Sequence, residues 1–279
     1  MNGNTVQTIS NTNAKKVTNY TADTTSPVLE KFDFNLNNGQ VTLSFSETVR
    51  VSSFAVEEVT FQNEANGGAQ TVSVALTTSS IVSTNGPVLV LQLSAADLNQ
   101  IKKESQLATH TNNTFVTITS SGISDMNGNA IVTINSSAAL GVSLFVGDTT
   151  PPTLVGYELN MNVGSIGVLT LTFSETVNAS SAVSSGFSLQ NLRDISGGGL
   201  SVQLQGGSFS QQDSTVVVLN LTITDTNRIK KLVGLAMDAN TTYLSIGNPA
   251  IKDMSGLDVV VVPSSNGQQV SAGRYTRDT

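Results

Sequence analysis

Acidic side chains recur at corresponding positions of this sequence, although charged residues make up only 12% of it. They stand in two segments of alternating apolar residues, in two Asp-Met turns and before Thr-rich linkers. Ca²⁺ takes several oxygen ligands, which loop carboxylates, Asn side chains and carbonyls can provide. The acids are interpreted as ordinary caps of turns and strand ends, with calcium sites at the domain junction as the alternative hypothesis. The candidate ligands are Glu47, Asp125, Asp148, Glu175, Asp253 and Asp278.

Two of these acids lie inside apolar strand patterns. The segments are "VTLSFSETV" (residues 41–49) and "LTLTFSETV" (residues 169–177). Because side chains alternate along a strand, Glu47 and Glu175 share a face with Phe45 and Phe173, which is the core side. A bare carboxylate there is costly. We therefore expect either a bulge after the phenylalanine, or a rim position with donors or a cation.

The same nine-residue pattern belongs to a longer internal repeat. Glu47, Asp97 and Asp125 each recur 128 residues later, at 175, 225 and 253. A repeat of this length predicts two domains, residues 23–147 and 148–279. Residues 1–22 match the stretch after Met126, and they are predicted to be the C-terminal strands of a preceding repeat. The chain would then be a piece of a longer array, with its first strands paired to the adjoining domain or to a neighbouring chain.

Turn pairs such as Asn38-Gly39 and Asn85-Gly86 divide the chain into short alternating runs, which are typical of an antiparallel β-sandwich. The runs at residues 88–93 and 216–221 are apolar enough to be central strands buried on both sides. One short helix is expected in each repeat, around "DLNQIKK" and "DTNRIKK". Its lysines, Lys102, Lys103, Lys230 and Lys231, are interpreted as a solvated face.

The order of these motifs, with "DMNGN" and the linker "DTTPP", resembles the bacterial-type Ig-like repeats of surface-layer and adhesin proteins. The resemblance covers essentially the whole chain. It implies an all-β fold of tandem Ig-like sandwiches and a location outside the cell or on its surface. It also implies a spacer, adhesion or fibre-forming role, and it provides no catalytic residues. Pro151 and Pro152 fix backbone angles and should stiffen the joint between the repeats.

Composition excludes several other classes. The formal net charge of -7 argues against a nucleic-acid partner, and no apolar run is long enough to cross a membrane. The chain has no Cys, and no nucleophile motif accompanies its one histidine, His110.

We expect a structural, non-enzymatic segment of a long extracellular fibre or cell-surface array, whose partners are neighbouring repeats or copies of the same protein. The alternative is an adhesin module that binds a glycan or a protein, stiffened by calcium.

Asn-x-Ser/Thr sequons predict glycosylation if the protein is secreted by a eukaryote. Several would arise by chance in a chain so rich in Asn, Ser and Thr. The direction of the side chain in the strand at residues 216–221 decides whether its sequon can be modified. The candidates are Asn19, Asn112, Asn135, Asn178, Asn220 and Asn240.

Overall fold

The computed structural model describes residues 3 and 5–278, and most of their regular structure is β-strand. Met1, Asn2, Asn4 and Thr279 lie outside the described residues, so the start of the predicted preceding repeat falls there. The prediction of a mainly β fold with antiparallel sheets is confirmed. Nine short 3-10 helices occur among the described residues: η1 (Asn11–Asn13), η2 (Val51–Ser53), η3 (Val56–Glu58), η4 (Thr111–Asn113), η5 (Ser136–Ala138), η6 (Ala179–Ser181), η7 (Ser184–Gly186), η8 (Ala239–Thr241) and η9 (Ser264–Asn266).

The first repeat folds into two sheets, with strand orders β5-β6-β2-β1-β9 and β4-β3-β7-β8. The pair β1 and β9 is parallel, and the other strand pairs of these sheets are antiparallel. The strands are β1 (Leu29–Asn35), β2 (Gln40–Val49), β3 (Val59–Gln62), β4 (Ser73–Ala75), β5 (Ser80–Ile81), β6 (Gly86–Gln92), β7 (Phe115–Ile118), β8 (Leu140–Gly141) and β9 (Leu144–Val146).

The second repeat has the same plan, with orders β14-β15-β11-β10-β19 and β13-β12-β16-β18, while β17 also pairs with β11. The repeat in the sequence is therefore a repeat in strand order. The strands are β10 (Leu154–Val163), β11 (Ile166–Asn178), β12 (Phe187–Gln190), β13 (Ser201–Gln203), β14 (Ser208–Phe209), β15 (Ser214–Asn220), β16 (Tyr243–Ile246), β17 (Lys252–Asp253), β18 (Gln268–Gln269) and β19 (Tyr275–Thr276).

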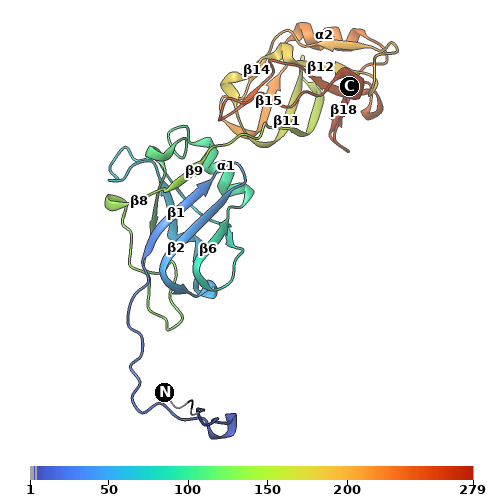
Figure 1. Ribbon diagram of the computed structural model, residues 1–279. Helices are drawn as coiled ribbons and strands as arrows, with labels where there is room; N and C mark the ends of the chain where they lie inside the picture. Colours follow the sequence, from blue (N-terminus) through green and yellow to red (C-terminus); the bar gives the residue numbers. More distant parts are fainter. Residues whose placement is uncertain (1–2, 4, 279) are drawn as a thin grey trace.

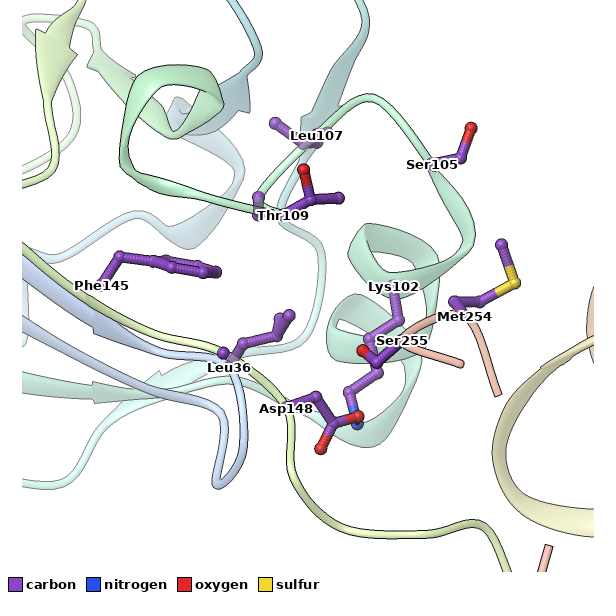
Figure 2. A pocket seen from close by; sticks show the side chains of 11 residues that line it. Leu36, Lys102, Ser105, Leu107, Thr109, Phe145, Asp148, Met254 and Ser255 are labelled. Carbon is purple, nitrogen blue, oxygen red and sulfur yellow. The ribbon is translucent and has the colours of Figure 1, made fainter. Parts of the chain in front are cut away.

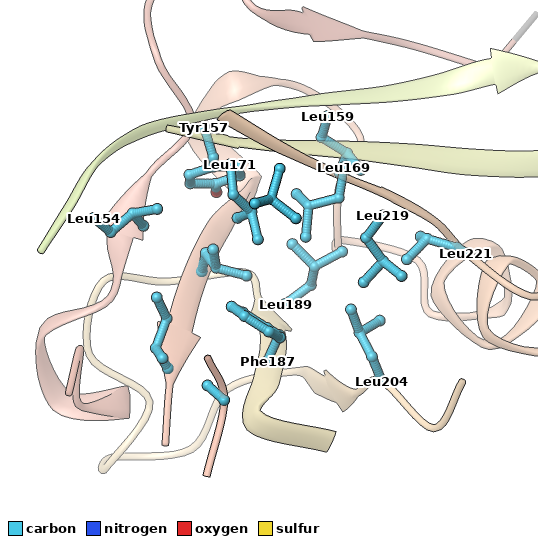
Figure 3. Close-up of a cluster of buried hydrophobic side chains, with 14 of the residues drawn as sticks. Leu154, Tyr157, Leu159, Leu169, Leu171, Phe187, Leu189, Leu204, Leu219 and Leu221 are labelled. Atoms are coloured by element: carbon cyan, nitrogen blue, oxygen red, sulfur yellow. The ribbon is translucent and has the colours of Figure 1, made fainter. Parts of the chain in front are cut away.

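Each repeat has its own cluster of buried apolar side chains, between its two sheets. In the second repeat, Leu169 and Leu171 of β11 meet Phe187 and Leu189 of β12 (Figure 3). The prediction that residues 88–93 and 216–221 are buried on both sides, or nearly so, is wrong, and Val216 is 41% exposed. Leu89 and Leu91 are buried, but Val88 is 50% exposed, so β6 has one core face and one open face.

The predicted helices are confirmed as α1 (Ala95–Lys103) and α2 (Ile223–Lys231). Each begins after a hydroxyl residue that caps it, since Ser94 and Thr222 accept the backbone N–H of the aspartate three residues on. These nine-residue helices are the longest in the described part of the chain, and none of its helices could span a membrane.

The segment before β1 extends away from the first sheet pair (Figure 1). Among its described residues it has the 3-10 helix η1 and no strand, and residues 5–25 are all exposed. Pairing with the adjoining repeat is therefore wrong for this chain. Pairing with a neighbouring chain stays a prediction.

Candidate functional site

A buried lysine joins the two repeats. Lys102 lies near the end of α1, and its Nζ is 2.7 Å from Asp148 Oδ2 and 2.6 Å from Glu175 Oε2. The exposed fractions of the three side chains are 7%, 1% and 9%. Figure 2 shows Lys102 reaching from the helix to Asp148 beside Met254 and Ser255 of the second repeat. The interpretation of Lys102 as part of a solvated helix face is wrong, because the second repeat covers it.

A second polar contact lies one helical turn earlier on the same face of α1. The Thr176 N–H donates to Asn99 Oδ1 at 2.8 Å, and the Thr176 hydroxyl donates to the Asn99 carbonyl at 3.1 Å. Thr176 is only 2% exposed. Because Asn99 and Lys102 bind adjacent residues of β11, they fix both the position and the rotation of that strand against the helix.

The linker is bound at both of its ends. Thr149 N–H and the Thr150 hydroxyl donate to Asn37 Oδ1 of the first repeat, at 3.0 and 2.8 Å. Pro152 is buried, and its carbonyl accepts the N–H of Val260 of the second repeat at 2.9 Å. The residues that follow Asp148 therefore have little freedom to swing.

Both alternatives expected for the strand glutamates are present. The ladder between β11 and β15 is regular to Thr172 and resumes only at Val177, so Glu175 lies in a bulge. The ladder between β2 and β6 has the same break between Ser44 and Val49, around Glu47. Glu175 is also at a rim, where it meets the Lys102 ammonium. The bulge turns the carboxylate out of the core toward the neighbouring repeat.

Two of three clustered carboxylates bind this ammonium group, and Asp253 is the third member of the cluster. One oxygen each of Asp148, Glu175 and Asp253 lie within 4.8 Å of one another. Burial raises the pKa of Glu175 to about 7, since Lys102 lowers it less and Asp148 raises it further. Burial alone would lower the pKa of Lys102, but its hydrogen bonds to Asp148 and Glu175 raise that pKa above the usual range. One cation thus pairs with two acids of a cluster of three, and burial disfavours the charge of Glu175.

Asp253 Oδ1 accepts the backbone N–H groups of Ser255 and Leu257, at 2.9 and 2.8 Å. Its buried Oδ2 has no hydrogen-bond partner. Burial raises the pKa of this carboxyl, and these backbone hydrogen bonds offset only part of that. The turn thus holds Asp253 in place through Oδ1, while Oδ2 accepts no hydrogen bond.

A calcium ion fits this cluster poorly, because the ammonium of Lys102 already stands between Asp148 and Glu175. Binding of Ca²⁺ would require displacing a side chain that is 7% exposed. The interaction at this site is an ion pair between a lysine of the first repeat and carboxylates of the second.

The first repeat has the matching cluster of Asp23, Glu47 and Asp125, again within 4.8 Å of one another. Asp125 Oδ1 accepts the N–H groups of Asn127 and Asn129, and its Oδ2 accepts the Asn129 amide at 2.8 Å. Burial and the nearby Asp23 and Asp125 raise the pKa of Glu47. Carboxylates gathered in this way favour a cation, so Ca²⁺ stays a prediction here.

The candidate ligands divide into these two clusters and one separate pair. Asp278 binds Lys230 of α2 at 2.9 Å, and both side chains are partly exposed. Asp23 was not among the candidate ligands, although its position before Thr-Thr matches that of Asp148. The sequence did not identify Lys102 as a residue of the site. Its neighbour Lys103 has the same residue type, and the two differ only because the second repeat packs against Lys102.

The helix aspartates have a structural role. Asp97 accepts hydrogen bonds from the backbone and hydroxyl groups of Thr77 and Ser79 and from Thr78 N–H. Burial alone would raise its pKa, but these hydrogen bonds hold the pKa of Asp97 well below its usual value. Asp225 accepts the N–H groups of Gln205 and Gly206 in the second repeat. Both residues fasten the helix to the preceding loop.

The other candidates lie at the surface. Five sequon asparagines are exposed, including the one in β15, and Asn178 is half-buried, with its Oδ1 accepting from Ser180. His110 is exposed and caps η4 by accepting the Asn112 N–H. Glycosylation stays a prediction. The exposed sequon asparagines are Asn19, Asn112, Asn135, Asn220 and Asn240.

No protein-family model matches the sequence, and no curated protein matches it. The geometry itself shows what the junction can do. It holds the ammonium group of one repeat between two carboxylates of the next. It can also fix one repeat against the next through α1, the linker and the bulge of β11.

Proposed function

We propose that this chain is a stiff structural segment of a long extracellular fibre or cell-surface array. Its task is to span distance and transmit load between neighbouring repeats. In this proposal it is not an enzyme, and its partners are repeats or copies of the same kind.

Strand order supports tandem Ig-like sandwiches as the architecture. An Ig constant-type domain has one sheet in the order A-B-E-D and another in the order C-F-G. With β1 as A, the first repeat has β1-β2-β6-β5 and β3-β7-β8 in those orders. The second repeat has β10-β11-β15-β14 and β12-β16-β18. The parallel β9 beside β1 extends the first sheet.

The observation that carries the proposal is the buried ion pair of Lys102 with Asp148 and Glu175. A flexible linker would leave such side chains in water, where exposed ion pairs contribute little. Here the lysine lies between the repeats and is reinforced by the Asn99 contact to Thr176. Removing one partner of a buried pair is costly, so the geometry favours one fixed angle between the repeats.

Nuclear magnetic relaxation of backbone ¹⁵N tests the proposal. A stiff segment should give both repeats one anisotropic rotational diffusion tensor, elongated along the chain. This should hold in 0.5 M salt, because salt screens a buried pair far less than an exposed one. Separate correlation times for residues 29–146 and 154–276 in the unmodified chain would overturn it.

A further inference from the structure

The acidic cluster of the first repeat has the composition of the cluster that binds Lys102. Asp23, Glu47 and Asp125 correspond to Asp148, Glu175 and Asp253. In the described chain, no lysine or arginine forms a salt bridge with any of the first three carboxylates. The second repeat therefore shows, at equivalent positions, what such a cluster binds: a lysine ammonium from the helix of another repeat.

The far end of the second repeat offers that helix. Asn227 and Lys230 of α2 match Asn99 and Lys102 of α1 in "DTNRIKK" and "DLNQIKK". Both residues of α2 are exposed. The Lys230 side chain is 30% exposed, against 7% for Lys102, and its present partner Asp278 is 46% exposed.

The apolar surroundings of the two helices also match. The cleft beside Lys102 is lined by Leu36, Leu107 and Phe145, and Met254 of the next repeat closes it. The cleft beside Lys230 is lined by Met161, Leu235 and Tyr275 at the corresponding places. Val233 and Met237 at this cleft are 83% and 42% exposed.

The first repeat carries the group that would close such a cleft. Met126 occupies the place of Met254 in the Asp-Met turn, and it is 50% exposed. Thr48 corresponds to Thr176 and is exposed, whereas Thr176 is buried. The first repeat thus carries acids, a threonine and a methionine that match the receptor of the internal junction, and the second repeat carries a helix that matches its ligand.

We propose that the second repeat of one chain docks end to end on the first repeat of a second copy, with Lys230 bound by Glu47 as Lys102 is bound by Glu175. This inference rests on the proposed function, because the internal junction is its template. Asn227 accepts the Thr48 N–H, and Met126 enters the cleft beside Tyr275. Asp278 holds Lys230 as Asp148 holds Lys102, so this pair stays in place on docking and Glu47 takes the place of Glu175. A contact between two different ends does not close on itself, and it therefore builds a linear filament.

Cross-linking tests this contact, because the chain has no cysteine of its own. Asn127→Cys and Val233→Cys chains, one of them isotope-labelled, are mixed at high concentration and treated with a short bismaleimide. These positions match Ser255 and Ser105, which line one cleft at the internal junction. We expect products that join one chain of each kind to exceed those joining like chains. Lys230→Met in the Val233→Cys chain should lower their yield by about tenfold, as for loss of an interfacial charge partner. Lys231→Met is the matched control and should leave the yield unchanged.

A second pair, Ser105→Cys with Ser255→Cys in one chain, reports on the internal junction, whose cleft both residues line, and should cross-link within the chain. If this pair reacts and the mixed chains do not, the inference is overturned while the proposed function stands. If neither reacts, both fail. If Ca²⁺ abolishes the mixed product and raises the melting temperature of the unmodified chain, the cluster is a calcium site and the inference is overturned.

Discussion

Two clusters with the same acids differ in what lies against them. Glu175 is buried beside Lys102, while Glu47 is half-buried and has no such partner among the described residues. Thr176 is buried and Thr48 is exposed. In the second repeat the carboxylates are one half of a joint, because they bind the helix of the repeat before it. The same acids alone, as in the first repeat, do not make a joint.

The two Asp-Met turns differ in a second way. Asn129 gives Asp125 Oδ2 a side-chain donor at 2.8 Å, and Leu257 at the matching position gives Asp253 none. Hydrogen bonds hold the pKa of Asp125 below its usual value despite burial, whereas burial raises the pKa of Asp253. Asp253, in the turn beside Lys102, thus receives fewer hydrogen bonds from its own repeat than Asp125 does.

The largest effect is expected from Lys102→Met. It removes the cation that Asp148 and Glu175 bind, and breaking a buried pair should weaken the coupling between the repeats by about 3 kcal/mol. Calorimetry should show a lower melting temperature for the second repeat, and ¹⁵N relaxation should show two correlation times. Lys103→Met, at an exposed neighbour, is the control; equal effects of the two variants would argue against the joint.

The second-largest loss of coupling between the repeats is expected from Asn99→Ala. It leaves the buried Thr176 N–H without its acceptor, which costs about 2 kcal/mol of coupling. Amide exchange at Thr176 measures this directly, because its protection depends on the closed joint. Asn227→Ala, at the exposed counterpart in α2, is the matched control. Unchanged protection in Asn99→Ala would contradict the role given to this contact.

The joint should also depend on pH through Glu175. Its pKa in the folded chain is raised to about 7, chiefly by burial, so the folded joint binds a proton more tightly than the unfolded chain does. This contribution to stability is full below the ordinary pKa of a glutamate and is lost as the pH rises through 7. The melting temperature of the second repeat should therefore fall between pH 5 and pH 8, and Glu175→Gln should flatten that slope. A slope of the opposite sign would contradict the assignment.

The smallest effect concerns the two turns. Leu257→Asn should provide the donor that Asp253 Oδ2 lacks and should stabilise the second repeat by about 1 kcal/mol. The reverse change, Asn129→Leu, should destabilise the first repeat. Urea unfolding of both variants checks this. If Leu257→Asn is neutral, the missing donor is not the reason for the difference between the turns.

Much of the fold could be predicted, because local chemistry specifies it. The alternation around Phe45 and Phe173, and the hydroxyl-x-x-Asp starts of α1 and α2, were sufficient for the strands and helices. The open face of β6 could not be predicted, since Val88 has the same residue type as a buried valine.

The joint was predictable only in part. The repeated acids marked it, but a carboxylate cluster alone does not distinguish Ca²⁺ from an ammonium group. That distinction depends on which residue of "IKK" faces the next repeat, and this is set by docking rather than by local sequence. The bulge that carries Glu175 was one of two predicted alternatives, and both are present.

Double electron–electron resonance, which measures the distance between two spin labels, gives the most direct test of the claim that Lys102 fixes the two repeats at one angle. Spin labels at Glu57→Cys and Gln211→Cys, both exposed, report the distance between the repeats without touching the joint. We predict a single narrow distribution that Lys102→Met broadens and Lys103→Met does not. A broad distribution in the chain with Lys102 intact would contradict the account.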